Sequence, residues 1–179
     1  MIYLLLAEGF EETEALAVLD ILRRGDLDVR TVGITGRTIT GAHGIRVEAD
    51  LLPHEAVTAP ELLVLPGGMP GTANLDASPE VDRLLSLTLS SGGRVGAICA
   101  APSILGKRGL LRGCEAVCYP GFEEHLLGAS LATKTVITSG PYTTAVGMGA
   151  ALAFALELLS LLRGAELADQ VASAAFIVR

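Results

Sequence analysis

The feature that most constrains the fold is a set of short, almost wholly apolar runs separated by longer amphipathic segments. Residues 1–7, 61–65 and 94–98 are runs of this kind. A strand with one solvent-facing side alternates apolar and polar residues, whereas a continuous apolar run needs cover on both faces. Strands of this type that are linked by helices pair in parallel. The pattern therefore predicts an α/β fold with a mostly parallel sheet and helices on both faces.

The remaining elements follow from periodicity and from end signals. In residues 11–24, Leu16, Leu19 and Leu22 recur at helical spacing, acids crowd the first turn, and Arg23 and Arg24 close the last. The same reasoning predicts helices at 78–90, 101–107, 143–162 and 165–175, strands at 28–34, 116–119 and 133–139, and a hairpin region at 35–50.

Length and composition favour one domain over residues 1–179. With 50% hydrophobic residues, a chain of 179 residues can bury roughly 70% of its unfolded surface and needs no disulfide or structural metal. Residues 145–162 approach the length of a membrane span. They include Glu157, Ser160 and many small residues, so a buried helix is the better interpretation and no membrane contact is expected.

Charge and cysteine usage limit the partners and the compartment. Thirteen basic and twenty acidic residues give a net charge of -7, and no basic run is present, so nucleic acid is not an expected partner. The first seven residues are too short for a secretory signal. Together with three cysteines, an odd number, this indicates a reducing, cytoplasmic location.

Cys99 is the leading candidate for chemistry. It follows the apolar run 94–98 and precedes a predicted helix, within the segment AICAAP at 97–102. This layout is similar to a nucleophile elbow. The unpaired N–H groups at a helix N-terminus favour a thiolate, so a lowered pKa is expected for the thiol. The alternative is a buried and inert cysteine.

Two other features fall at the same sheet edge. Gly67 and Gly68 end the run at 61–65, and their backbone amides, with that of Ala100, could form an oxyanion site. An ordinary turn is the alternative. Acids in the 11–14 segment normally complement a helix dipole, but one of them could reach Cys99 and share its proton.

No metal site is expected. Cys114 and Cys118 are four apart on a predicted strand, over ~13 Å if extended, and the three histidines, at 43, 54 and 125, show no metal-ligand spacing.

Four segments in order carry a family resemblance along essentially the whole chain. They are AEGFEETE at 7–14, VLPGG at 64–68, AICAAP at 97–102 and TSGP at 138–141. In sequence and spacing they resemble the ThiJ/PfpI family, also called the DJ-one superfamily, and its ThiJ branch more than its protease branch. The resemblance implies a flavodoxin-like three-layer sandwich, and usually a homodimer.

The resemblance also implies roles for individual residues. Cys99 corresponds to the family's reactive, oxidation-sensitive cysteine and Glu14 to its protonated carboxyl partner, with amides of Gly68 and Ala100 at the sulfur. Arg24 and His43 match positions near the family's dimer interface and pocket. Tyr119 and Pro141 are further pocket or interface candidates.

Two departures narrow the activity. Ala100 follows the cysteine where the protease-like and amidotransferase-like branches commonly have a histidine, which argues against peptidase and glutaminase action. Tyr119 precedes Pro120 where the ThiJ branch often has a histidine, so Glu14 would move protons alone or with water.

The expected function is therefore a thiol enzyme that acts on small reactive carbonyls, similar to a glyoxalase or deglycase, with no cofactor. One alternative is a redox sensor or oxidative-stress protective protein, including a chaperone-like one, whose Cys99 is oxidised to a sulfinate. Another is a small acyl hydrolase.

Overall fold

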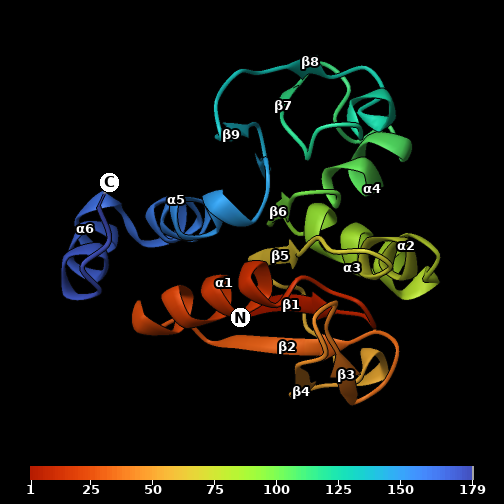
Figure 1. Ribbon diagram of the computed structural model, residues 1–179, viewed down its shortest axis with the longest axis horizontal. Helices are drawn as coiled ribbons and strands as arrows, with labels where there is room; N and C mark the ends of the chain where they lie inside the picture. The colour runs from red at the N-terminus through yellow and green to blue at the C-terminus, as the bar shows by residue number, and fades with distance from the viewer. Residues whose placement is uncertain (179) are drawn as a thin grey trace.

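A six-stranded sheet forms the centre of the computed structural model, which describes residues 1–178 (Figure 1). The strand order is β2-β1-β5-β6-β10-β9, and every pairing is parallel except that of β9 with β10. The six strands are β1 (Ile2–Leu6), β2 (Val29–Gly33), β5 (Leu62–Leu65), β6 (Arg94–Ile98), β9 (Val136–Ser139) and β10 (Tyr142–Ala145). This is the mostly parallel α/β sheet that the apolar runs predict.

Side chains of β1 alternate between two separate cores. Ile2, Leu4 and Leu6 belong to one buried cluster, whereas Tyr3 and Leu5 belong to the other. Because successive side chains of a strand point to opposite faces, both faces of the sheet are covered. This is why the strand has no polar position.

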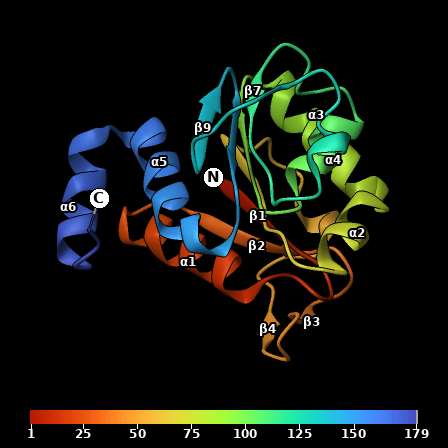
Figure 2. The same cartoon turned by 45° about the horizontal axis from the view of Figure 1, so that its top comes forward.

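Helices lie on both faces of the sheet (Figure 2). The first core is closed by α1 (Glu12–Arg24), α5 (Ala151–Arg163) and α6 (Ala165–Ala174), and the second by α2 (Gly71–Asp76), α3 (Pro79–Ser90) and α4 (Pro102–Lys107). The result is a three-layer sandwich of the flavodoxin-like type. Within residues 1–178, no helix is both long and apolar enough to cross a membrane.

The helix expected at 143–162 is wrong in its first third. Thr143 and Thr144 lie in β10, fully buried between β6 and β9, where β-branched side chains pack well. Gly147 then has φ 157°, outside helical geometry. A short 3₁₀ turn, Met148–Ala150, leads into α5.

Two other elements differ from expectation. The strand expected at 116–119 has only two residues, β7 (Glu115–Ala116), which pairs with β8 (Ser130–Leu131) in a separate two-stranded sheet. Helix α2 was not expected, because its first turn follows Pro70 and contains Gly71, a composition typical of loops.

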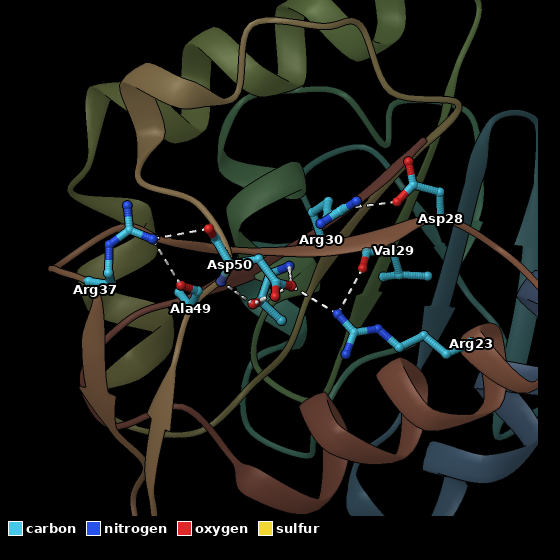
Figure 3. A network of polar contacts seen from close by, with 8 residues as sticks. Arg23, Asp28, Val29, Arg30, Arg37, Ala49 and Asp50 are labelled. Atoms are coloured by element: carbon cyan, nitrogen blue, oxygen red, sulfur yellow. Dashed lines mark hydrogen bonds and ion pairs between the residues drawn. The ribbon is translucent and has the colours of Figure 1, made fainter.

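The hairpin of β3 (Thr38–Thr40) and β4 (Arg46–Glu48) is fastened to the sheet by Asp50 (Figure 3). Asp50 Oδ2 accepts hydrogen bonds from the Thr31 backbone N–H at 2.8 Å and from Arg23 at 2.9 Å, and Arg37 donates to the Asp50 carbonyl at 3.0 Å. Burial opposes ionisation of Asp50, but the Thr31 hydrogen bonds and the Arg23 charge outweigh it and lower the pKa. Two further short segments, Pro53–Glu55 and Glu123–His125, are 3₁₀ helices.

Candidate functional site

The candidate site lies where β1, β5 and β6 end. These three strands are neighbours in the sheet and all run in the same direction, so the loops that follow them meet at one edge. The chain places β2 on one side of β1 and β5 on the other, which creates a topological switch point. Ligand sites of open α/β sheets form at such points. Gly67 and Cys99 come from the loops after β5 and β6, and Glu14 comes from the first turn of the helix that follows β1.

Cys99 occupies a strained turn directly after β6. Its φ is 64°, in the left-handed region that residues other than glycine seldom adopt. Two backbone hydrogen bonds hold it there: its N–H donates to the Ala145 carbonyl at 2.9 Å, and its carbonyl accepts from the Tyr119 N–H at 2.7 Å. The half-buried thiol is thus presented on a rigid bend, as the elbow interpretation requires.

Glu14 faces this thiol from the first turn of α1. Its side chain is buried, and the Gly67 N–H donates to its Oε2 at 2.8 Å. Its other oxygen, Oε1, is buried without a hydrogen-bond partner in the part of the chain that the structure describes. A Cβ on Gly67 would lie 2.5 Å from Cys99 Cβ and 2.7 Å from Glu14 Oε2. Only glycine lets the three groups come this close.

Burial raises the pKa values of both groups. The pKa of Glu14 rises to about 7 because burial outweighs the hydrogen bonds with Gly67 and Cys99. The pKa of Cys99 rises to about 12 because of burial and the adjacent Glu14 charge, against which the Gly68 and Ala100 amides act. At neutral pH the Cys99 thiol therefore keeps its proton, and the Glu14 carboxyl is protonated in part of the molecules.

This corrects the expected direction of the Cys99 pKa. Helix α4 is only six residues long, so its dipole contributes little. Burial and the adjacent Glu14 carboxylate destabilise the Cys99 thiolate more than the Gly68 and Ala100 amides stabilise it, so the pKa rises. The thiol is therefore activated by a base that takes its proton. Glu14, with a pKa of about 7, is placed to do so.

The expected amide donors separate into two groups. Gly68 and Ala100 direct their N–H groups at the Cys99 sulfur, where they lower its pKa. Gly67 differs from the expectation, because its N–H is used by Glu14. Gly67 therefore orients the carboxylate, whereas the other two amides are placed to stabilise negative charge on the sulfur or on an atom bound to it.

Of the four outlying candidates, the structure brings only Tyr119 to Cys99. Its ring and the Cys99 sulfur both border Gly147. Arg24 lies ten residues along α1 from Glu14, about 15 Å away, and pairs with Asp20. Its position at an interface stays a prediction.

Pro141 also lies away from the sulfur. It precedes β10, and its carbonyl accepts from Val95 at the start of β6. Cys99 follows the other end of β6, roughly 15 Å away at strand spacing.

His43 joins two acids beside the site, an arrangement that spacing along the chain did not reveal. In the β3–β4 hairpin, His43 Nδ1 lies 2.8 Å from Glu12 Oε2 and 3.7 Å from Glu11 Oε2. The hydrogen bond with Glu12 raises the pKa of His43. Burial opposes ionisation of Glu12, but hydrogen bonds from His43 and Ile45 lower its pKa. One ligand atom from each of Glu11, Glu12 and His43 lies within 4.8 Å of the others, so these residues could hold a cation.

Gly147 and Met148 are site residues that the sequence did not indicate. The incorrect helix at 143–162 hid them, although the glycine pair at 147 and 149 signals a break. Their loop begins at the end of β10, the strand beside β6, and therefore reaches the same edge.

Comparison with known proteins gives consistent similarities. The model of the DJ-1/PfpI family matches residues 1–161. The chain is 35% identical over 173 residues to Protein DJ-1 homolog A of Arabidopsis thaliana, covering 94% of this chain and 44% of that protein. The chain thus spans less than half the length of that relative.

Two further similarities cover most of both chains. The chain is 31% identical over 166 residues to the glutathione-independent glyoxalase DJR-1.2 of Caenorhabditis elegans, covering 91% of this chain and 88% of the relative. The structure of oxidized DJ-1 from Toxoplasma gondii superposes with a TM-score of 0.95 at 29% identity, covering 99% of this chain and 98% of the other.

Proposed function

The chain belongs to the DJ-1/PfpI family, and on that premise we propose that it is a cysteine-dependent enzyme acting on small reactive carbonyls, with glyoxalase-type chemistry. A relative of nearly the same length is named a glutathione-independent glyoxalase. The observation that carries the proposal is the contact between a buried carboxyl of pKa about 7 and a thiol at a strained elbow.

The first step is addition of the Cys99 sulfur to the aldehyde carbon of a 2-oxoaldehyde such as methylglyoxal. As the S–C bond forms, the thiol proton passes to the Glu14 carboxylate, and the carbonyl π electrons pass to the oxygen. The N–H groups of Gly68 and Ala100, which face the sulfur, support that negative oxygen. Glu14 then returns the proton to the oxygen and gives a neutral hemithioacetal.

The second step is an isomerisation within the adduct. Glu14, again a carboxylate, removes the proton from the former aldehyde carbon and delivers it to the neighbouring carbon through an enediol. In the same isomerisation the hydroxyl proton of the hemithioacetal passes to the former ketone oxygen. The product is a 2-hydroxyacyl thioester, which water hydrolyses to the 2-hydroxy acid and the free thiol. One carbon is oxidised and its neighbour is reduced, so the reaction balances with water as co-reactant and without an external oxidant or reductant.

The test is the consumption of methylglyoxal by the parent protein, by Cys99→Ser and by Cys114→Ser, followed by lactate formation in NMR spectra. Cys114 is a free cysteine outside the site, so its variant is the matched control. We expect lactate from the parent and from Cys114→Ser and a loss of at least 10²-fold for Cys99→Ser. Equal rates for the Cys99 variant would overturn the proposal.

A second candidate function is oxidation sensing at the same cysteine. The Glu14 side chain and the Gly68 and Ala100 amides face the Cys99 sulfur, and Glu14 Oε1 has no hydrogen-bond partner among the described residues. They could bind the two oxygens of a sulfinate that two equivalents of peroxide would form. Intact mass after mild peroxide distinguishes the cases. A gain of two oxygens confined to Cys99 supports sensing, and equal oxidation of Cys114 and Cys118 argues against it.

We extend the proposal to organisation and compartment. The chain acts as one domain and as a homodimer in a reducing, cytoplasmic environment, where its three free cysteines stay reduced. Light scattering on the purified protein tests the dimer. A monomer at micromolar concentration would contradict it.

A further inference from the structure

A cavity of about 650 Å³ that is open to solvent lies beside Gly147, the glycine that borders the Cys99 sulfur. Its walls are Tyr119 and Pro120, the loop 146–150 that follows β10, Thr135, and Ala153 on α5. The proposed mechanism uses none of these side chains. We call this cavity the tail pocket.

The tail pocket approaches the Cys99 sulfur at Gly147, one of its lining residues. A methyl group built on Gly147 would lie 3.9 Å from Cys99 Sγ and 3.3 Å from Tyr119 Cδ2. The φ of 157° suits glycine, so no side chain closes this passage. A group attached to the sulfur through one or two carbons can therefore reach the cavity.

The lining of the tail pocket is apolar. Met148, Val146, Ala150 and Ala153 contribute aliphatic groups, and the Tyr119 ring contributes an aromatic face. No described residue of the lining is charged. The Glu14 carboxylate, which lies beside Cys99, would repel an anionic substituent.

The volume exceeds what the smallest substrate needs. Cavities of ~300–1,000 Å³ hold ligands of drug size, whereas the substituent of methylglyoxal is a single methyl group. An apolar cavity of about 650 Å³ has room for a chain of several carbons or for a phenyl ring, whose burial increases affinity with the area removed from water.

We propose that the tail pocket receives the apolar substituent of the carbonyl substrate, so that the substrate class is uncharged 2-oxoaldehydes with an alkyl or aryl tail of several carbons. This inference rests on the proposed function for its substrate. The pocket itself can be probed without turnover.

The first experiment measures kcat/KM for a straight-chain series from methylglyoxal to 2-oxooctanal. Beyond the first added carbon, the reactive end is chemically constant along the series, so the trend reports tail binding. Each buried methylene should raise kcat/KM by roughly fourfold until the pocket is filled. Values that stay flat or fall along the series would overturn the inference.

The second experiment measures Cys99 labelling by N-ethyl-, N-butyl- and N-hexylmaleimide, located by peptide mass analysis. The sulfur adds across the ring double bond, so labelling needs no turnover. Rates relative to those for glutathione should rise with chain length. If labelling rises but methylglyoxal is not consumed, the proposed function fails and the pocket stands. If labelling is flat while methylglyoxal is consumed, the pocket fails and the function stands.

Ala153→Leu provides the structural control, because it places three extra carbons in the tail pocket from an exposed helix position. It should remove the chain-length dependence in both experiments. Ala165→Leu, an exposed site on α6, should retain the full dependence. An unchanged dependence in Ala153→Leu would also overturn the inference.

Discussion

Replacing Glu14 by Gln should stabilise the folded protein at and above neutral pH. Burial raises the pKa of Glu14 from the ordinary 4.5 to about 7. The folded state therefore keeps a proton between pH 4.5 and 7 that the unfolded state has lost. Stability contributed by this group is fully present below pH 4.5 and declines as pH rises through that window.

The expected magnitude follows from the width of the window. At ~1.36 kcal/mol per pKa unit, the rise from 4.5 to about 7 removes about 3 kcal/mol from the parent. Gln does not ionise, so Glu14→Gln escapes this loss. The difference in unfolding free energy between the variant and the parent should grow by about 3 kcal/mol from pH 4 to pH 8.

The measurement is urea unfolding of both proteins under reducing conditions, at several pH values and equal protein concentration. Taking the difference cancels the titration of all other groups that behave alike in the two proteins. Glu48→Gln, at an exposed position on β4, is the control and should show a constant difference. A constant difference for Glu14→Gln as well would show that Glu14 does not hold its proton in the folded state.

Three other predictions follow from the site and the fold. The kcat/KM for methylglyoxal should rise about tenfold per pH unit up to a plateau near pH 7, as Glu14 loses its proton; a profile without this limb would remove Glu14 as the base. Gly67→Ala should cost about 1–3 kcal/mol in urea unfolding, because its Cβ would lie 2.5 Å from Cys99 Cβ; a neutral effect would contradict the tight packing. Asp50→Ala should cost about 1–3 kcal/mol at pH 7 through the lost Thr31 and Arg23 bonds, and the cost should shrink below pH 4, as the lowered pKa of Asp50 requires. A cost that persists undiminished in acid would assign the effect to packing.

Much of the fold could be predicted from periodicity, because the two-sided burial of a parallel sheet leaves a plain signal. Residues 94–98 form β6 with the expected bounds. The signal failed at residues 143–145, which were expected to begin the helix 143–162 but pack into the sheet as part of β10. Tertiary pairing with β6 and β9 decides that assignment, and it cannot be seen in a local window.

The site was only partly predictable for a related reason. Cys99 and the amides could be located, because each follows a recognisable strand, whereas Glu14 was singled out among the acids at 11–14 only by the family resemblance. The electrostatic environment of Cys99 could not be predicted, because it depends on burial and on the position of Glu14 across the strand ends. The Glu12–His43 pair likewise joins residues 31 positions apart, a distance that spacing rules do not address.

The division of β1 between two cores restricts how this chain can vary in length. Insertion or deletion of one residue within Ile2–Leu6 would exchange the positions of Tyr3 and Leu4, which fill different clusters, and would disturb both at once. The same step would also move the segment that carries Glu14 relative to Cys99. Length changes are therefore expected to be tolerated outside the sheet core, for instance in the exposed turn at Gly92, where an added side chain would meet open space.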